Sequence, residues 1–310
     1  MSRRSWLASA AAACGTGLAT IGAKRGEIGL GFSLYGMKSL SLAEALRVCA
    51  ECGYDCVELP VMVDWPADSA KLAADARRQL RGQLADRELR LTALMENLPA
   101  LGDEARHRQN LERLKLACGV ARDLAPPGTG EGGVPLVETV LGGKAGDWDA
   151  VKGKLAERLG DWSAVLAEAQ VKLAIKAHVG NATQQPQQLI WLLEQVASPW
   201  LAAAYDYSHF QLQDLAMTET VQALAPRTIF VHVKDTEHSQ GKRGFLLPGE
   251  GTIDHGELAK SLGVAGYRGD IVVEVSGQVF SKPGYDPVAA AQKCYRYLAT
   301  VLDRAGVRPS

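Results

Sequence analysis

Metal-binding and proton-transferring side chains stand at the carboxyl ends of four apolar segments. The segments are residues 172–180, 200–210, 228–235 and 270–277. The side chains at their ends are Lys176, His178, Asp206, His209, His232, Lys234, Asp235 and Glu274. A buried carboxylate is costly unless it is paired, and a metal ion is one such partner. The four ends therefore predict a single site for metal binding or proton transfer.

Three of these residues form a set of oxygen and nitrogen donors. Asp206, His232 and Glu274 together suit Mn²⁺, Zn²⁺, Co²⁺ or Mg²⁺, with waters or a substrate completing the coordination shell. A single histidine at a strand end is more often a structural polar residue than a ligand. The prediction of a divalent metal therefore depends on the group.

The side chains of a strand alternate between its two faces, so one register must serve all four segments. Placing Glu274 inward also places Val272 inward and turns Ile271 and Val273 toward the helices. The same choice groups Asp206 with Ala204, His232 with Phe230 and Lys234, and Lys176 with Ala174 and His178. The titratable groups then converge. The alternative is that they are loop residues that face water.

Strand-like and helix-like segments alternate along the whole chain. The expected strands lie at 27–35, 55–60, 89–99, 134–141, 171–178, within 200–210, at 228–234 and at 270–277. The expected helices are 42–53, 68–87, 103–124, 147–170, 186–196, 217–224, 254–262 and 286–304. This alternation predicts an α/β fold, a single-domain (β/α)8 TIM barrel with its site at the carboxyl ends of the strands. An open doubly wound sheet is the alternative, although the chain lacks its Gly-rich dinucleotide loop.

Composition narrows the functional classes. The 310 residues suit one barrel domain, and the net charge of −1 gives no basic face for nucleic acid. No run of about 18 apolar residues predicts a membrane span. The six cysteines are expected to pack in the core and not to form a disulfide framework. The oligomeric state stays open, a homo-oligomer included.

Residues 1–26 are expected to be a targeting segment, with the barrel at 27–305. SRRSWL (2–7) precedes an Ala-rich run and resembles a twin-arginine export signal. The prediction is an exported, periplasmic protein. The alternative is a helical or disordered tail on a cytoplasmic protein.

Four segments carry a resemblance to a known family: DYSH (206–209), HVKD (232–235), LPGEGTID (247–254) and GYRGDIVVEVSG (266–277). Over residues 27–305 the chain resembles the xylose isomerase-like TIM barrels, the sugar phosphate isomerase/epimerase family. Tagatose epimerases, inosose dehydratases and endonuclease IV belong to it. The resemblance implies a metal-dependent isomerase, epimerase or lyase with a small carbohydrate as substrate.

The resemblance also implies roles for individual residues. The family holds its metal with a Glu, an Asp, a His and a Glu after strands five to eight. Asp206, His232 and Glu274 match the last three. His209 matches a histidine that contacts substrate or a second metal. Further polar residues near the mouth are candidates for substrate binding, namely His178, Lys234, Asp235, Glu250 and Glu96.

Lys176 departs from the family pattern, because it stands where the first metal-ligating Glu is expected. A protonated amine cannot ligate a metal. The site would then have three protein ligands, or His178 or Glu138 would supply a fourth. Epimerisation by the family's usual pair of carboxylate bases also needs that Glu, so this chain would need a different second base.

The principal hypothesis is removal of the proton next to a sugar carbonyl, with the metal stabilising the enediolate. Glu274 would be the base. Lys176, with a pKa lowered beside a cation in a dry site, would be the acid or second base. His209 would assist.

Two alternatives belong to other classes. Lys176 on an inner strand suits a metal-free Schiff-base lyase or aldolase. A barrel without the strand-five Glu would instead bind sugars without turnover. Endonuclease activity is disfavoured, because Glu58 and Glu96 stand where further histidine ligands would be needed. Loop 236–252 is expected to form a lid.

Overall fold

The computed structural model describes residues 28–128, 133–239 and 242–308. The predicted targeting segment, residues 1–26, lies outside the described part. No helix within those ranges combines the length and the apolar composition that a membrane crossing requires.

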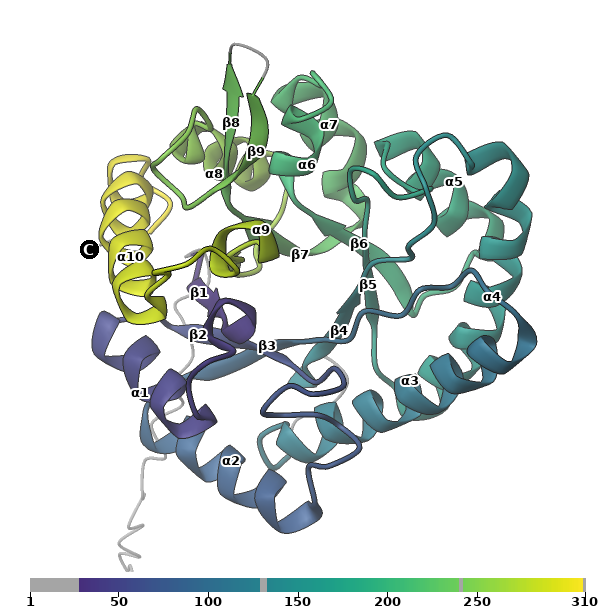
Figure 1. Cartoon of the computed structure of the whole chain (residues 1–310), viewed down its shortest axis with the longest axis horizontal. Helices are drawn as coiled ribbons and strands as arrows, with labels where there is room; N and C mark the ends of the chain where they lie inside the picture. Colours follow the sequence, from purple (N-terminus) through teal and green to yellow (C-terminus); the bar gives the residue numbers. More distant parts are fainter. Residues whose placement is uncertain (1–27, 129–132, 240–241, 309–310) are drawn as a thin grey trace, which may run out of the picture.

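Eight parallel strands close into a barrel, which confirms the predicted fold class (Figure 1). They are β1 (Leu30–Ser33), β2 (Cys56–Pro60), β3 (Arg90–Met95), β4 (Leu136–Thr139), β5 (Leu173–Lys176), β6 (Leu201–Tyr205), β7 (Thr228–Val233) and β10 (Ile271–Val273). Consecutive strands are neighbours, and β10 pairs with both β7 and β1 to complete the ring. A closed ring excludes the open doubly wound sheet.

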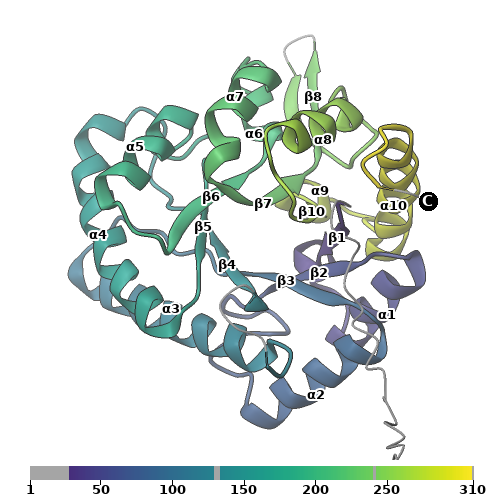
Figure 2. The same ribbon diagram turned by 180° about the vertical axis from the view of Figure 1, so that it is seen from behind.

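Helices surround the barrel on all sides, as Figures 1 and 2 show from opposite ends. The long ones are α1 (Leu42–Cys52), α2 (Ala74–Asp86), α3 (Glu104–Leu124), α4 (Trp148–Ala169), α5 (Pro186–Val196), α7 (Met217–Leu224), α8 (His255–Val264) and α10 (Pro287–Arg304). Short helical turns follow three of the strands, namely η1 (Leu34–Met37), α6 (Tyr207–Gln211) and α9 (Gly277–Phe280), and another, η3 (Ala225–Arg227), connects α7 to β7. Most boundaries lie within two residues of those expected.

Local hydrogen bonds and backbone conformation fix the ends of these helices. The Ser41 side chain accepts a hydrogen bond from Glu44 N at the start of α1, and Gly53, at φ 94°, ends that helix in a left-handed conformation. Helix α2 begins six residues after the expected Asp68. The Asp68 carboxylate instead accepts a hydrogen bond from Ala70 N, which closes a local turn.

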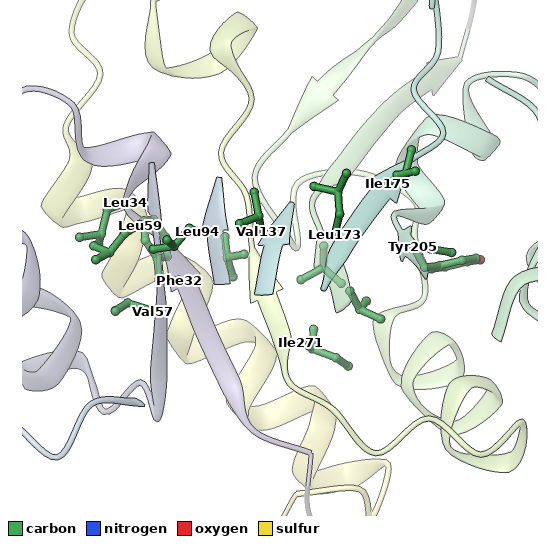
Figure 3. Close-up of a cluster of buried hydrophobic side chains, with 14 of the residues drawn as sticks. Phe32, Leu34, Val57, Leu59, Leu94, Val137, Leu173, Ile175, Tyr205 and Ile271 are labelled. Atoms are coloured by element: carbon green, nitrogen blue, oxygen red, sulfur yellow. The ribbon is translucent and has the colours of Figure 1, made fainter. Parts of the chain in front are cut away.

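The barrel separates two apolar regions. Outward-facing strand residues pack against the helices, and Figure 3 shows Leu94, Val137, Leu173 and Ile271 among them. The barrel interior contains a second, small cluster of Cys56, Ala93, Ala174, Ala204, Phe230 and Val272. This inner set confirms the predicted register. Its three alanines leave space above them for long polar side chains.

The loop expected at 236–252 contains an antiparallel hairpin. Strands β8 (Asp235–Ser239) and β9 (Lys242–Leu246) pair from Asp235 with Leu246 to Ser239 with Lys242. The hairpin packs against α6 and α9 at the rim of the barrel (Figure 1). Glycine and charged residues dominate this segment, and this composition predicts a loop. The assignment of a plain loop is wrong.

Five cysteines lie in the described part of the chain, and all are free. Cys49, Cys56, Cys118 and Cys294 are buried, and Cys52 is partly buried. Core packing is therefore confirmed for this part of the chain.

Asp235 joins the hairpin to the loop that follows it. Its carboxylate accepts hydrogen bonds from Thr236 N at 2.9 Å, Gly249 N at 3.0 Å and Ile253 N at 3.0 Å. The side chain is buried. Three backbone N–H groups therefore depend on one carboxylate.

We expect Asp235→Ala to lower the free energy of unfolding by about 3 kcal/mol, because it leaves buried N–H donors without acceptors. The control is Asp86→Ala, an exposed position on α2, for which we expect a change within about 0.5 kcal/mol. Urea denaturation of both variants measures the difference. Equal stability of the two variants would contradict the proposed role of Asp235.

Candidate active site

A cavity opens at the carboxyl ends of the barrel strands. Its volume is about 80 Å³, and its mouth is partly open to solvent. Its lining residues are Tyr35, Asn97, Val140, Lys176, His178, His209, Lys234, Phe245, Glu274, Ser276 and Gly277. Five of the eight predicted strand-end residues therefore line one cavity, and Asp206 and His232 contact its lysines.

Lys234 lies between two carboxylates. Its Nζ donates to Asp206 Oδ2 at 2.5 Å and to Glu274 Oε2. Asp206 is held from its other side, because Oδ1 accepts hydrogen bonds from Ser208 N at 3.1 Å and from Ser208 Oγ at 2.5 Å. The start of α6 therefore fixes the carboxylate that the Lys234 ammonium contacts.

The Lys176 side chain lines the same cavity and has three partners. Its Nζ lies 3.0 Å from His232 Nδ1, 3.0 Å from Glu274 Oε2 and 3.2 Å from Glu138 Oε1. The first two are hydrogen bonds and the third is an ion pair. An ammonium group has three N–H donors, so the surroundings of Lys176 match its capacity.

A deeper layer lies beneath the cavity. Glu58 Oε2 accepts a hydrogen bond from His232 Nε2 at 2.9 Å. Nδ1 of the same ring therefore points to Lys176. Glu58 and Glu138 are both fully buried. Burial raises the pKa of Glu138, and the Lys176 ammonium opposes that rise.

The charges in this cluster stabilise one another. Burial acts to raise the pKa of Glu274, but Lys176 and Lys234 hold it well below its ordinary value. Burial acts to lower the pKa of Lys176, yet Glu138, Glu274 and Asp206 raise it above its ordinary value. The expected lowering of the Lys176 pKa is therefore wrong, because the deeper carboxylates outweigh desolvation.

Two histidines complete the polar wall, and their rings lie 4.1 Å apart. Burial first, and then Lys176 and Lys234, lower the pKa of His178 to about 4. Burial likewise lowers the pKa of His209. Both rings are neutral at pH 7. His178 Nδ1 donates to Val179 O at 2.8 Å, which leaves Nε2 as an acceptor.

His209 has the opposite tautomer. Its Nδ1 accepts a hydrogen bond from Val179 N at 3.3 Å, so the proton is on Nε2. That nitrogen is buried and has no hydrogen bond within the described chain, although it lies 3.5 Å from Asp206 Oδ2. The pair thus offers one acceptor, His178 Nε2, to a hydroxyl-bearing ligand, whereas the His209 donor faces Asp206.

Aromatic side chains form the rest of the wall. Phe245, from β9, packs against the His209 ring at 4.9 Å and lies 5.4 Å from Lys234 Nζ. Tyr35 stacks on Trp65 at 4.8 Å and meets the edge of Phe280 at 5.0 Å. Trp65 and Phe280 therefore support Tyr35 and do not line the cavity.

One candidate metal site is the group formed by Asp206, His232 and Glu274. Their ligand atoms lie within 4.8 Å of one another, and their donor types suit a divalent ion. Each is already hydrogen-bonded to an ammonium group: Asp206 to Lys234, His232 to Lys176, and Glu274 to both. As placed, the residues do not fit a divalent ion, which would stand beside two positive charges.

Comparison with known proteins gives the family. The model of the xylose isomerase-like TIM barrel matches residues 46–301. The chain belongs to that family. A fructoselysine 3-epimerase of Escherichia coli O157:H7 is 22% identical over 261 residues, which cover 80% of this chain and 90% of the epimerase. An inosose dehydratase of Lactiplantibacillus plantarum is 26% identical over 149 residues, covering 43% and 49%.

Among solved structures, the IolI protein with a bound zinc atom superposes with a TM-score of 0.74. It is 19% identical, and the match covers 90% of this chain and 99% of that one. The expectation of an enzyme family of carbohydrate isomerases and epimerases is therefore confirmed. The IolI structure holds a zinc atom, and this chain has a candidate set of metal ligands. A divalent ion in this chain stays a prediction.

Three predicted substrate contacts lie elsewhere. Glu96 accepts hydrogen bonds from Arg113, Asp235 anchors the loop described above, and Glu250 pairs with Lys293. None of the three lines the cavity. Their predicted role is not supported, because each carboxylate is turned toward a structural partner.

The residues of the site that were not predicted as part of it include Glu58, Tyr35, Asn97, Ser276 and Phe245. Glu58 ends a predicted strand, and pairing strand ends around the ring would have found it. Phe245 depends on the hairpin, which the sequence did not indicate.

We expect Lys176→Met to lower the free energy of unfolding by about 3–5 kcal/mol, because it leaves buried carboxylates without their cation. Adding Glu138→Gln should recover part of this loss, by about 1–3 kcal/mol, since it removes one of those charges. Urea denaturation with a chelator present measures both variants. The control is Lys260→Met, at an exposed position on α8. Strict additivity of the two substitutions would show that their charges are not coupled.

Proposed function

We propose that this protein is a carbohydrate epimerase, isomerase or dehydratase that removes a proton from the carbon next to a carbonyl group. The observation that carries the proposal is Glu274, a cavity-lining carboxylate whose Oε2 accepts hydrogen bonds from Lys176 and Lys234. It combines a base with two cations at one point of contact with a ligand.

Glu274 is ionised, because the two lysines lower its pKa. Its Oε1 makes none of the contacts of Oε2 and is the oxygen assigned to take the proton. When the C–H bond breaks, its electron pair forms the C=C bond of the enediolate and the carbonyl π pair moves to oxygen. Cationic N–H donors next to that oxygen stabilise the developing negative charge.

The cavity favours a polyhydroxylated ligand. His178 offers an acceptor, and Asn97 and Ser276 add further polar groups. The two cations of the lining are engaged with carboxylates, so no side chain of the lining offers a free positive charge to a phosphate. An unphosphorylated keto-sugar or keto-inositol is the substrate class that these groups suit.

The relatives support this class of reaction. One is named as a fructoselysine 3-epimerase and another as an inosose dehydratase. Epimerisation and dehydration next to a carbonyl share their first step, the loss of an acidified C–H proton. The same base therefore serves either outcome.

A divalent ion at Asp206, His232 and Glu274, namely Mn, Zn, Co or Mg, is the competing form of this proposal. The donor set and the zinc of the IolI structure support it. When bound, such an ion would polarise the carbonyl oxygen. Such an ion can bind only if the ammonium groups of both lysines break their hydrogen bonds to these three residues.

The Schiff-base alternative is less favourable than proton abstraction by Glu274. It needs a neutral Lys176 amine, whereas the surrounding carboxylates raise the pKa of this lysine and keep it protonated. Sugar binding without turnover uses the same cavity, and the following experiment separates it from catalysis.

We expect Glu274→Gln to reduce turnover by about 10²–10⁴-fold, because the amide cannot accept the proton. The assay incubates keto-sugars and inososes with the protein in D₂O and follows loss of the α-proton signal by NMR. Proton exchange reports the first step, whichever product forms.

The matched control is Glu168→Gln, an exposed position on α4, which should keep wild-type exchange. Full exchange in Glu274→Gln would refute the assignment of the base. Saturable binding of a sugar by wild type without any exchange would favour the binding-only function.

We also propose export through the twin-arginine-like segment SRRSWL (2–7), which lies outside the described residues. Arg3→Lys with Arg4→Lys should shift the protein from the periplasmic to the cytoplasmic fraction, because the paired arginines form the recognised signal. Fractionation of cells that express both forms measures this. Identical distributions would contradict export by this route.

A further inference from the structure

We infer that the Lys176 and Lys234 ammonium groups replace a divalent metal in this site and provide its positive charge. The two single charges equal that of one divalent ion. The catalytic part of this inference rests on the proposed function, whereas the absence of metal binding does not.

The first support is where the ammonium groups lie. Lys234 contacts Asp206 and Glu274, and Lys176 contacts His232 and Glu274. These three residues form one of two groups in the described chain whose ligand atoms lie within 4.8 Å of one another; the other group is Glu58, Glu138 and His232. The two lysines thus engage every residue of the candidate ligand set and bridge its members as an ion would.

The second support is that each ammonium is held in place. Lys176 and Lys234 are only 3% and 2% exposed, so both side chains are largely removed from solvent. Glu138 lies 3.2 Å from Lys176 on the side away from the cavity and is itself fully buried. Moving Lys176 aside to admit an ion would leave that carboxylate without a partner.

The third support is the histidine. A hydrogen bond from Nε2 to Glu58 turns Nδ1 of His232 into the site, the orientation of a metal-binding ring. Nδ1 faces Lys176 at 3.0 Å. The ring is therefore oriented as if for an ion, but it accepts a hydrogen bond from an ammonium group.

In the reaction, a substrate carbonyl oxygen would accept the third N–H donor of Lys234, since Asp206 and Glu274 take the other two. Glu274 then removes the α-proton, and the electron pair released from carbon ends on that oxygen. Return of the proton reverses the flow. Proton and electrons balance within the protein and substrate, and no further reactant is needed.

The test measures metal binding directly and needs no substrate. Wild-type protein is treated with a chelator, dialysed against Co²⁺, Mn²⁺ or Zn²⁺ and examined by elemental analysis. We expect well below one equivalent of metal. About one equivalent, lost in Asp206→Asn, would overturn the inference.

The variant that should gain a metal is Lys176→Met with Lys234→Met. Removal of both cations exposes the donor set, so we expect about one equivalent of Co²⁺, visible absorption bands and a higher melting temperature with Co²⁺. Adding Asp206→Asn should abolish the gain. The matched control is Lys260→Met on the surface. Should the double variant fail to fold, the wild-type metal content still decides.

Turnover separates the two proposals. Proton exchange that persists in a chelator, in a wild type without metal, supports both. Exchange that disappears in the chelator and returns with Mn²⁺ supports the function and refutes the inference. If the wild type binds no metal and exchanges no proton on any substrate, the proposed function is refuted. The inference that the two lysines occupy the place of a metal is then still supported.

Discussion

The rest of the site depends on the balance of buried charge inside the barrel. Glu58, Glu138, Asp206 and Glu274 are almost fully removed from water. An isolated buried carboxylate is strongly disfavoured, so the group can persist only with cations among its members. Lys176 and Lys234 are the cations within the barrel mouth, and their contacts reach three of the four carboxylates. The fourth, Glu58, is held by His232.

The barrel provides the space and the direction for this cluster. The interior below the polar layer is filled by the methyl groups of Ala93, Ala174 and Ala204 and by the ring of Phe230. Long side chains one pleat further along the strands can then meet near the axis. Larger residues at the alanine positions would separate the cluster by filling the same volume. The small interior residues are thus as necessary to the chemistry as the charged ones.

Much of this was predictable from sequence, for identifiable reasons. The alternation of strands and helices predicts the barrel, and the period of two predicts which side of each strand carries Asp206, His232 and Glu274. What failed depends on contacts between distant segments. Glu96 lies at a strand end as Glu274 does, but Arg113 from α3 pairs with it. The pKa of Lys176 was expected to fall because a metal was assumed beside it, whereas the surrounding carboxylates, Glu138 first among them, raise it.

A lysine at position 176 changes what its neighbours must be. In a site built around a metal, a carboxylate there supplies charge to the ion, and its own counter-charge comes with the ligand. A lysine brings a fixed positive charge that persists whether or not any ligand is bound. Glu138 on the adjacent strand meets that requirement from below and Glu274 from the cavity side. Under the replacement that we infer, the cation that a substrate oxygen meets is covalently part of the fold, and its position depends on strand register instead of metal supply.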